Sequence, residues 1–288
     1  MTTSTDIEPA PTPMKGVILA GGAGTRLLPM TRVTNKHLLP VYDRPMVYYP
    51  IELLRRAGIE EILLVCGGNS AGSFVDLLGA GAEFGLKELA YAYQEGPRGI
   101  ADALRLAEDF ADGLPVVVGL GDNIVQYGIR PAVEAFARQL EANAGRGARI
   151  LLSEVNDPSR FGVARFDEQS GRLAEIIEKP DSPPSRLAVM GYYLYDASVF
   201  ELIESLEPSK RNEYEITDVN NLYLERDLLE WSVHPGWWTD AGTVRSLYRA
   251  TRLVAESGAN HDYPDDGAAD SADDATIVEP SESRRSRA

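Results

Sequence analysis

One glycine-rich turn constrains the fold more than any other part of this sequence. Residues 14–20 are mostly apolar and predict a buried parallel strand, and Gly21, Gly22 and Gly24 follow directly. Without a Cβ the backbone can turn sharply and approach a ligand, and its free N–H groups bind anions. Arg26 adds a planar cation at the end of the turn. The stretch predicts a strand that leads into a phosphate-binding loop; a glycine-rich turn without a ligand is the alternative.

The spacing of these glycines excludes two familiar nucleotide loops. Residues 21–26 read Gly-Gly-Ala-Gly-Thr-Arg, which matches neither the G-x-G-x-x-G dinucleotide loop nor the G-K-[ST] ending of ATPase loops. An NAD-dependent dehydrogenase would also need an acidic residue about 20 positions further on, to bind the ribose. Residues 36–40 in that region read Lys-His-Leu-Leu-Pro, so the charge is wrong for a dehydrogenase.

The charge balance excludes a nucleic-acid partner. The 288 residues carry a formal net charge of −16, whereas proteins that bind polyanions need a basic face. A phosphate ligand must therefore be bound by a few local cations. No apolar run approaches the roughly 20 residues needed to span a bilayer, and residues 1–13 do not resemble a signal peptide, so we expect no membrane partner. The single cysteine, Cys66, lies in an apolar run and fits a reducing cytoplasm.

Strand and helix patterns alternate in the first half of the chain. Buried strands are expected at 14–20, 62–66, 89–94 and 115–122, and helices at 44–57, 71–78, 101–110 and 129–142. Such alternation predicts an α/β fold whose parallel sheet is covered on both faces, with ligands at the carboxyl ends of its strands.

The second half of the chain changes character. Strands are expected at 148–155, 162–166, 173–178 and 189–195, and the short polar turns between them favour antiparallel pairs. Helices at 197–205 and 214–225, a last strand at 231–240 and a closing helix at 243–256 complete the pattern. We expect a flexible leader over residues 1–13, a single domain over 14–257 and a disordered acidic tail over 258–288, because the two ends have almost nothing to bury.

An ordered set of short segments resembles the sugar-1-phosphate nucleotidyltransferases, most closely their thymidylyl-transferring members. The set comprises the loop 21–26, the Lys-x-Leu-Leu-Pro segment 36–40, Gly-Asp-Asn at 121–123, Glu-Lys-Pro at 178–180, Glu-Ile-Thr-Asp at 215–218 and Trp-Thr-Asp-Ala-Gly-Thr at 238–243. Each segment is a weak signal alone, but the ordered set, which covers about residues 14–255, is specific. The resemblance implies a single Rossmann-like domain with a mixed, mostly parallel sheet and an antiparallel subsheet that binds the sugar.

The resemblance also implies an enzyme. A sugar-1-phosphate oxygen attacks the α-phosphorus of a nucleoside triphosphate, and pyrophosphate leaves, with Mg²⁺ as the cofactor. The implied substrates are dTTP and glucose 1-phosphate, and the implied product is dTDP-glucose; UTP or another sugar 1-phosphate is the alternative. A non-catalytic nucleotide-sugar sensor is disfavoured because the charged residues of the motifs are all present. A homo-oligomer stays open, since the tail replaces the helices with which longer members build a tetramer.

By resemblance, three groups of residues build the site. The catalytic residues are Arg26, Lys36, Asp122, Lys179 and Asp240. The nucleotide contacts are Leu19, Gly21, Gly24, Thr25, Arg26, Gln94, Gly99, Asp122 and Asn123. The sugar-phosphate contacts are Gly162, Glu178, Lys179, Val189 and Arg211. One position departs from the pattern, because His37 stands where these enzymes commonly carry glutamine; it is either a neutral packing residue or a ligand.

Two of these assignments also follow from residue chemistry. Asp122 and Asp240 each follow an apolar strand, so both carboxylates can emerge at one edge of the sheet, where they would bind Mg²⁺. The alternative for each is a helix cap or a turn former. The amide of Gln94 offers a donor and an acceptor, which suits the edge of thymine or uracil, and Gly99 would let backbone approach the base.

Overall fold

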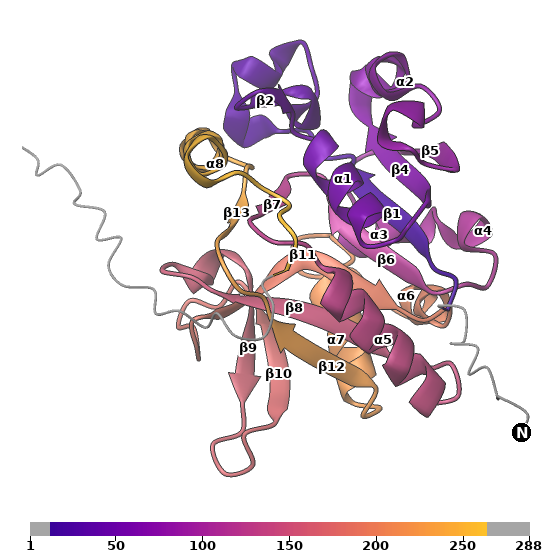
Figure 1. The fold of residues 1–288 in the computed structure, drawn as a ribbon. Coiled ribbons are helices and arrows are strands. Elements are labelled where there is room, and N and C mark those ends of the chain that lie inside the picture. Colours follow the sequence, from indigo (N-terminus) through magenta and orange to yellow (C-terminus); the bar gives the residue numbers. More distant parts are fainter. Residues whose placement is uncertain (1–11, 264–288) are drawn as a thin grey trace, which may run out of the picture.

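Strand β1, Lys15–Ala20, lies inside a nine-stranded sheet (Figure 1) in the computed structural model, which describes residues 12–263. It pairs in parallel with β4, Glu61–Gly67, on one side and with β6, Val116–Leu120, on the other. Strand β5, Glu88–Gln94, continues the parallel part beyond β4. The predicted parallel sheet is therefore confirmed, and the carboxyl ends of these strands meet along one edge.

The sheet becomes antiparallel beyond β6. Strand β11, Leu187–Tyr195, runs antiparallel to β6, to β8, Ala148–Glu154, and to β9, Gly162–Phe166. Strand β10, Leu173–Glu178, forms a hairpin with β9. The expected antiparallel subsheet is confirmed. Strand β12, Leu229–Val233, for which no pairing was predicted, pairs with β8 in parallel.

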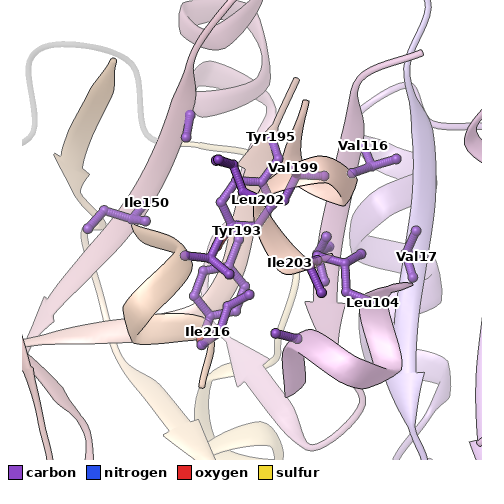
Figure 2. Close-up of a cluster of buried hydrophobic side chains, with 14 of the residues drawn as sticks. Val17, Leu104, Val116, Ile150, Tyr193, Tyr195, Val199, Leu202, Ile203 and Ile216 are labelled. Carbon is purple, nitrogen blue, oxygen red and sulfur yellow. The ribbon is translucent and has the colours of Figure 1, made fainter. Parts of the chain in front are cut away.

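Helices cover both faces of the sheet. One face carries α1, Tyr48–Arg56, α2, Ala71–Leu78, and α5, Arg130–Ala142; the other carries α3, Ile100–Arg105, α4, Glu108–Ala111, α6, Val199–Glu204, and α7, Ile216–Leu224. Because successive strand residues point to opposite faces, Val17 packs in the core beside α3 and α6, while Ile18 packs in the core beside α1. Figure 2 shows the first of these cores, in which Tyr193 and Tyr195 of β11 lie among aliphatic side chains.

Two short strand pairs and a last helix complete the fold. Strand β7, Asn123–Val125, pairs with β13, Trp238–Asp240, and β2, Pro40–Val41, pairs with β3, Arg44–Pro45. Helix α8, Val244–Ser257, packs over these pairs and closes a third apolar core. The pairing of β7 with β13 matters for function, because it joins a segment that follows β6 to a segment near the end of the domain.

The predicted helices at 44–57 and 101–110 differ from the structure. The first begins only at Tyr48, because the preceding Arg44 and Pro45 pair with β2. The second is divided into α3 and α4, because Leu106 and Ala107 donate hydrogen bonds to carbonyls three residues earlier and so tighten the helix into a turn.

The predicted last strand at 231–240 is wrong as one element. Between β12 and β13 the chain passes through Pro235, which lacks an N–H donor, and Gly236, whose φ is 74°. An ideal Cβ on Gly236 would lie 2.5 Å from Gln126 Oε1, so only glycine fits. The chain therefore leaves β8 and turns toward β7.

The predicted domain boundary at residue 257 is too early. Asn260 is 2% exposed; its side chain donates to the Tyr49 carbonyl at 2.9 Å and its N–H to the Val125 carbonyl at 3.1 Å. His261 then exchanges backbone hydrogen bonds with Gln126 and Gly128. Composition could not predict this contact, since the docking uses mainly hydrogen bonds and only Ala259 of this segment packs against the third apolar core. The predicted leader up to residue 11 and the predicted tail from residue 264 lie outside the described residues.

Cys66 is buried and forms no disulfide with any described residue. Within residues 12–263, the structure contains no helix with the length and apolar character needed to cross a membrane. The expected location in the cytoplasm stays a prediction.

We predict that residues 258–263 stabilise the domain. A chain that ends at Ser257 loses the hydrogen bonds that Asn260 donates to the Tyr49 and Val125 carbonyls, and a buried carbonyl left without a partner costs about 1–3 kcal/mol. Thermal unfolding followed by circular dichroism should give a clearly lower Tm for this chain than for one that ends at Tyr263. Equal Tm values for the two truncated chains would contradict the prediction.

Candidate functional site

A cavity of about 590 Å³ opens at the carboxyl ends of β1 and β6 and reaches the antiparallel subsheet. Most of the residues expected at the site line it: Leu19, Gly21, Arg26, Lys36, Gln94, Gly99, Asp122, Asn123, Gly162, Glu178, Lys179, Val189, Arg211 and Asp240. Segments far apart in sequence are therefore brought to one cleft, as expected from the rule that ligands bind where parallel strands end.

Gly24 and Thr25 are the exceptions, because they do not line this cavity. Gly24 adopts a left-handed conformation with φ 62°, and its carbonyl accepts hydrogen bonds from Leu27 N and from Thr31 Oγ1. An ideal Cβ on Gly24 would lie 2.9 Å from Thr31 Cγ2. The two residues shape a turn that buries Leu27 and directs Arg26 into the cleft. A direct phosphate contact from Gly24 or Thr25 stays a prediction.

A buried ion pair lies at the centre of the cleft. Lys36 Nζ donates to Asp122 Oδ2, and both side chains are more than four-fifths buried. Burial, the largest single effect, would raise the pKa of Asp122, but the Lys36 ammonium, neighbouring His37 and the hydrogen bonds from Lys36 and Asn123 together hold this pKa well below its usual range. Asn35 fixes the segment that carries Lys36, because its amide donates to the Ala20 carbonyl at the end of β1.

His37 is 2% exposed and lies beside this pair. Its Nδ1 lies 2.7 Å from Asn35 Oδ1, and its ring fills the space beside Gly121, where an ideal Cβ would lie 2.7 Å from His37 Cδ2. Burial, together with the Lys36 charge, lowers the pKa of His37 to about 3. The imidazole is thus neutral at pH 7, and these contacts favour the packing alternative over the ligand alternative.

Asp122 and Asp240 approach each other across Gly242. An ideal Cβ on Gly242 would lie 3.3 Å from Asp122 Oδ2 and 3.2 Å from Asp240 Oδ2, with Arg26 Nη2 at 3.1 Å. The β7–β13 pairing causes the approach, because it places Asp240 opposite Asn123, the neighbour of Asp122. The described residues contain no group of three acidic, histidine or cysteine side chains that could hold a metal. A hard cation at this pair would need phosphate or water oxygens as its remaining ligands.

Sequence reasoning missed Arg160, which lines the cleft and pairs with Asp240. The distance from Arg160 Nη2 to Asp240 Oδ2 is 3.1 Å. Arg160 directly precedes Phe161 and Gly162 in the sequence. Because Gly162 was expected to contact the sugar, the neighbouring Arg160 could have been predicted to lie at the site.

The amide of Gln94 was expected to offer a ligand both a donor and an acceptor, but in the structure its donor is used by the protein. Its Nε2 donates to Asp102 Oδ2 at 3.0 Å and to the Gly99 carbonyl at 3.3 Å. Both amide hydrogens are therefore bound by the protein, and Oε1 is the atom left beside Gly21, where an ideal Cβ would lie 2.7 Å from it. Sequence reasoning also missed Asp102, which is buried under this amide.

The side chain of Asn123, which was predicted to contact the nucleotide, forms hydrogen bonds with three other residues of the protein. Its Oδ1 accepts from Gly191 N at 3.0 Å and from Trp238 Nε1 at 2.7 Å, while its Nδ2 donates to Asp122 Oδ1 at 3.0 Å. With these partners the side chain is a brace for Asp122. Asn123 also lines the cleft, and its contact with the nucleotide stays a prediction.

The far end of the cleft holds the residues expected to bind the sugar phosphate. Glu178 accepts from Thr217 Oγ1 at 2.7 Å and pairs with Lys179 Nζ at 3.0 Å. Arg211 forms a two-pronged pair with Glu215, at 2.7 and 3.1 Å, and a third contact with Glu178 at 3.2 Å. The sequence placed Glu215 and Thr217 only within a motif, so the contact of Glu215 with Arg211 and the contact of Thr217 with Glu178 are additional findings.

The fold and this cleft define a class of protein, and comparison with known families agrees with it. The chain belongs to the nucleotidyl transferase family, whose model matches residues 15–257. Members of this family generally use a divalent metal.

Several relatives share a more specific name. The chain is 44% identical over 245 residues to the glucose-1-phosphate thymidylyltransferase of Neisseria gonorrhoeae, covering 84% of this chain and 82% of that protein. It is 44% identical to the Actinoplanes enzyme of the same name, covering 84% of this chain and 78% of that protein. A solved structure from Bacillus anthracis, assigned as a glucose-1-phosphate thymidylyltransferase in complex with a sucrose, is 49% identical with a TM-score of 0.78 and covers 84% of this chain and 96% of that one.

A more distant structure shares the fold. UDP-glucose pyrophosphorylase complexed with UDP-glucose is 24% identical, with a TM-score of 0.72, and the match covers 84% of this chain and 98% of that one.

Proposed function

We propose that the chain transfers dTMP from dTTP to glucose 1-phosphate, which gives dTDP-glucose and pyrophosphate. The observation that carries this proposal is one cleft in which the glycine-rich turn, Arg26 and Lys36 lie at one end and Lys179 and Arg211 lie at the other. Two polyanions must meet for this reaction, and the cleft supplies cations for each. The relatives named glucose-1-phosphate thymidylyltransferase support the same substrates.

Positioning and charge neutralisation would supply most of the catalysis, because phosphoryl groups in such reactions need little covalent help from the protein. Arg26 and the backbone beside Gly21 would hold the triphosphate, and Lys36 would contact the reacting phosphates. Lys179 and Arg211 would hold the phosphate of the sugar, with Glu178 accepting hydrogen bonds from its hydroxyls. The attacking oxygen would thus meet the α-phosphorus near the middle of the cleft.

The metal in this proposal is Mg²⁺, and the donor set at Asp122 and Asp240 fits it. Two carboxylates whose oxygens face one small space beside Gly242 are hard oxygen donors, and Mg²⁺ is commonly held by one or two carboxylates plus phosphate oxygens and water. When bound there, the ion would neutralise charge on the triphosphate. The carboxylates would first have to exchange their contacts with Lys36 and Arg160.

UTP is the second candidate for the nucleotide. The Oε1 atom of Gln94, the free acceptor beside Gly21, can accept the N3–H of uracil as well as that of thymine. The two bases differ only by a methyl group, which is worth about 1–3 kcal/mol even in a well-fitted apolar pocket.

The experiment that tests this function is a pyrophosphate-release assay over a panel of nucleoside triphosphates and sugar 1-phosphates. We expect the highest kcat/KM for dTTP with glucose 1-phosphate, and a dependence on added Mg²⁺. Turnover with UTP and not with dTTP would select the second candidate. A chain that binds dTTP but releases no pyrophosphate with any sugar phosphate would contradict an enzymatic function.

We predict that Asp122→Asn and Asp240→Asn each still fold and lose most turnover, and that Asp122→Asn also has a lower Tm because Lys36 loses its buried partner. Asparagine keeps the size of the side chain but removes the charge that a metal ion needs, whereas a cap would tolerate the change within about 1 kcal/mol. The residual activity should require a higher Mg²⁺ concentration, measured by Mg²⁺ titration of the initial rate. Unchanged activity and Mg²⁺ dependence in either variant would remove that residue from the metal site.

We also predict that Gln94→Ala weakens binding of the nucleotide and not of the sugar. The base would lose an acceptor for its N3–H, and one unpaired buried group costs roughly 1–3 kcal/mol. The KM for dTTP should rise at least about fivefold, while the KM for glucose 1-phosphate stays close to its original value. A variant that changes only the KM for glucose 1-phosphate would show that Gln94 does not bind the base.

A further inference from the structure

We infer that Asp102 sets the base specificity of this cleft by holding the amide of Gln94 in one orientation, so that bases with an N3–H are accepted and cytosine is rejected. The inference rests on the proposed function, because it concerns the base of the nucleotide. Asp102 would be a positioning residue, since it lies behind Gln94 and does not itself line the cavity.

The geometry around Gln94 leaves the amide one orientation. Asp102 lies in α3, its side chain is 4% exposed, and its Oδ2 lies 3.0 Å from Gln94 Nε2. A carboxylate accepts hydrogen bonds and cannot donate them, so rotating the amide by half a turn would bring Gln94 Oε1 against Asp102 Oδ2 without a proton between them. The Gly99 carbonyl, at 3.3 Å from Nε2, is also an acceptor and favours the same orientation of the amide.

Two arginines contact the carboxylate of Asp102 on the side away from Gln94. Arg98 Nη2 lies 3.3 Å and Arg105 Nη2 lies 3.5 Å from Asp102 Oδ1, so this oxygen faces the cations and Oδ2 faces Gln94. Because Asp102 Oδ1 contacts the arginines, Asp102 Oδ2 is the oxygen that accepts from Gln94. Asp102 thus holds the Gln94 amide so that Oε1, an acceptor, lies beside Gly21.

An acceptor at this place discriminates between pyrimidines. Thymine and uracil carry a hydrogen on N3 and can donate to Gln94 Oε1, whereas N3 of cytosine is itself an acceptor and would face Oε1 with two lone pairs opposed. A site built to bond a particular donor rejects an analogue that lacks it, because a buried polar group is then left unpaired. The orientation of one amide therefore separates the two classes of base.

Asp102→Asn should release this orientation. Asparagine has a single side-chain oxygen. Arg98 and Arg105 favour this oxygen on their own side, so the NH2 group of the asparagine faces Gln94. The Gln94 amide can then rotate, accept from the new donor with Oε1, and present Nε2 to the base. Cytosine N3 would meet a donor, and the N3–H of uracil would not meet an acceptor.

The test compares dUTP with dCTP, which differ only at the edge that carries N3, using the full chain, Mg²⁺ and glucose 1-phosphate. In Asp102→Asn the ratio of kcat/KM for dUTP to kcat/KM for dCTP should fall at least about tenfold from its wild-type value, while the KM for glucose 1-phosphate stays within about twofold. Asp109→Asn, an exposed aspartate in α4, is the matched control and should leave the ratio unchanged. A merely structural role for Asp102 would lower both values of kcat/KM together and would overturn the inference.

A second measurement uses the wild-type chain and does not depend on how the variant folds. dTTP methylated at N3 cannot donate to Gln94 and should be consumed at least about tenfold more slowly than dTTP, by kcat/KM. Equal turnover of the two nucleotides would overturn the inference and leave the proposed function intact. Absence of turnover with every pyrimidine nucleotide would overturn the proposed function, and the inference with it.

Discussion

The buried ion pair between Lys36 and Asp122 organises the rest of the site. Each charge would cost several kcal/mol if it were buried without its partner, so the two loops that carry them must meet at the edge of the sheet. Asn35 ties the first loop to the end of β1, and Asn123 braces the carboxylate of the second. Because β7 begins at Asn123, directly after Asp122, its pairing with β13 also brings Asp240 to the cleft.

Apolar periodicity predicted the layered fold because the buried strands are long enough to show it. Strands β1 and β4 are nearly continuous apolar runs, and both lie inside the sheet with helices on each face. The pairing of β7 with β13 could not be predicted, since each strand is only three residues long and its partner lies more than a hundred residues away. Asn260 was assigned to a disordered tail for a similar reason: polar docking leaves no apolar pattern.

The residues of the site were predictable where their chemistry appears at the end of a strand or in a glycine-rich turn. Asp122 and Gln94 have such positions, and the structure brings both to the cleft. What the sequence could not supply is the direction of each polar group, because this depends on partners that only the folded chain brings near. Gln94 donates to Asp102 and Asn123 is engaged by Trp238, and neither contact follows from spacing.

Four of the cations that line the cleft are already paired with carboxylates: Lys36 with Asp122, Arg160 with Asp240, Lys179 with Glu178 and Arg211 with Glu215. In the proposed function, an arriving phosphate would therefore take a cation away from its carboxylate. Each such exchange would also free a carboxylate. If Lys36 turned to phosphate, Asp122 would be free to bind a divalent ion, so that triphosphate and metal would each favour binding of the other, and a chain with a net charge of −16 could still bind two anions.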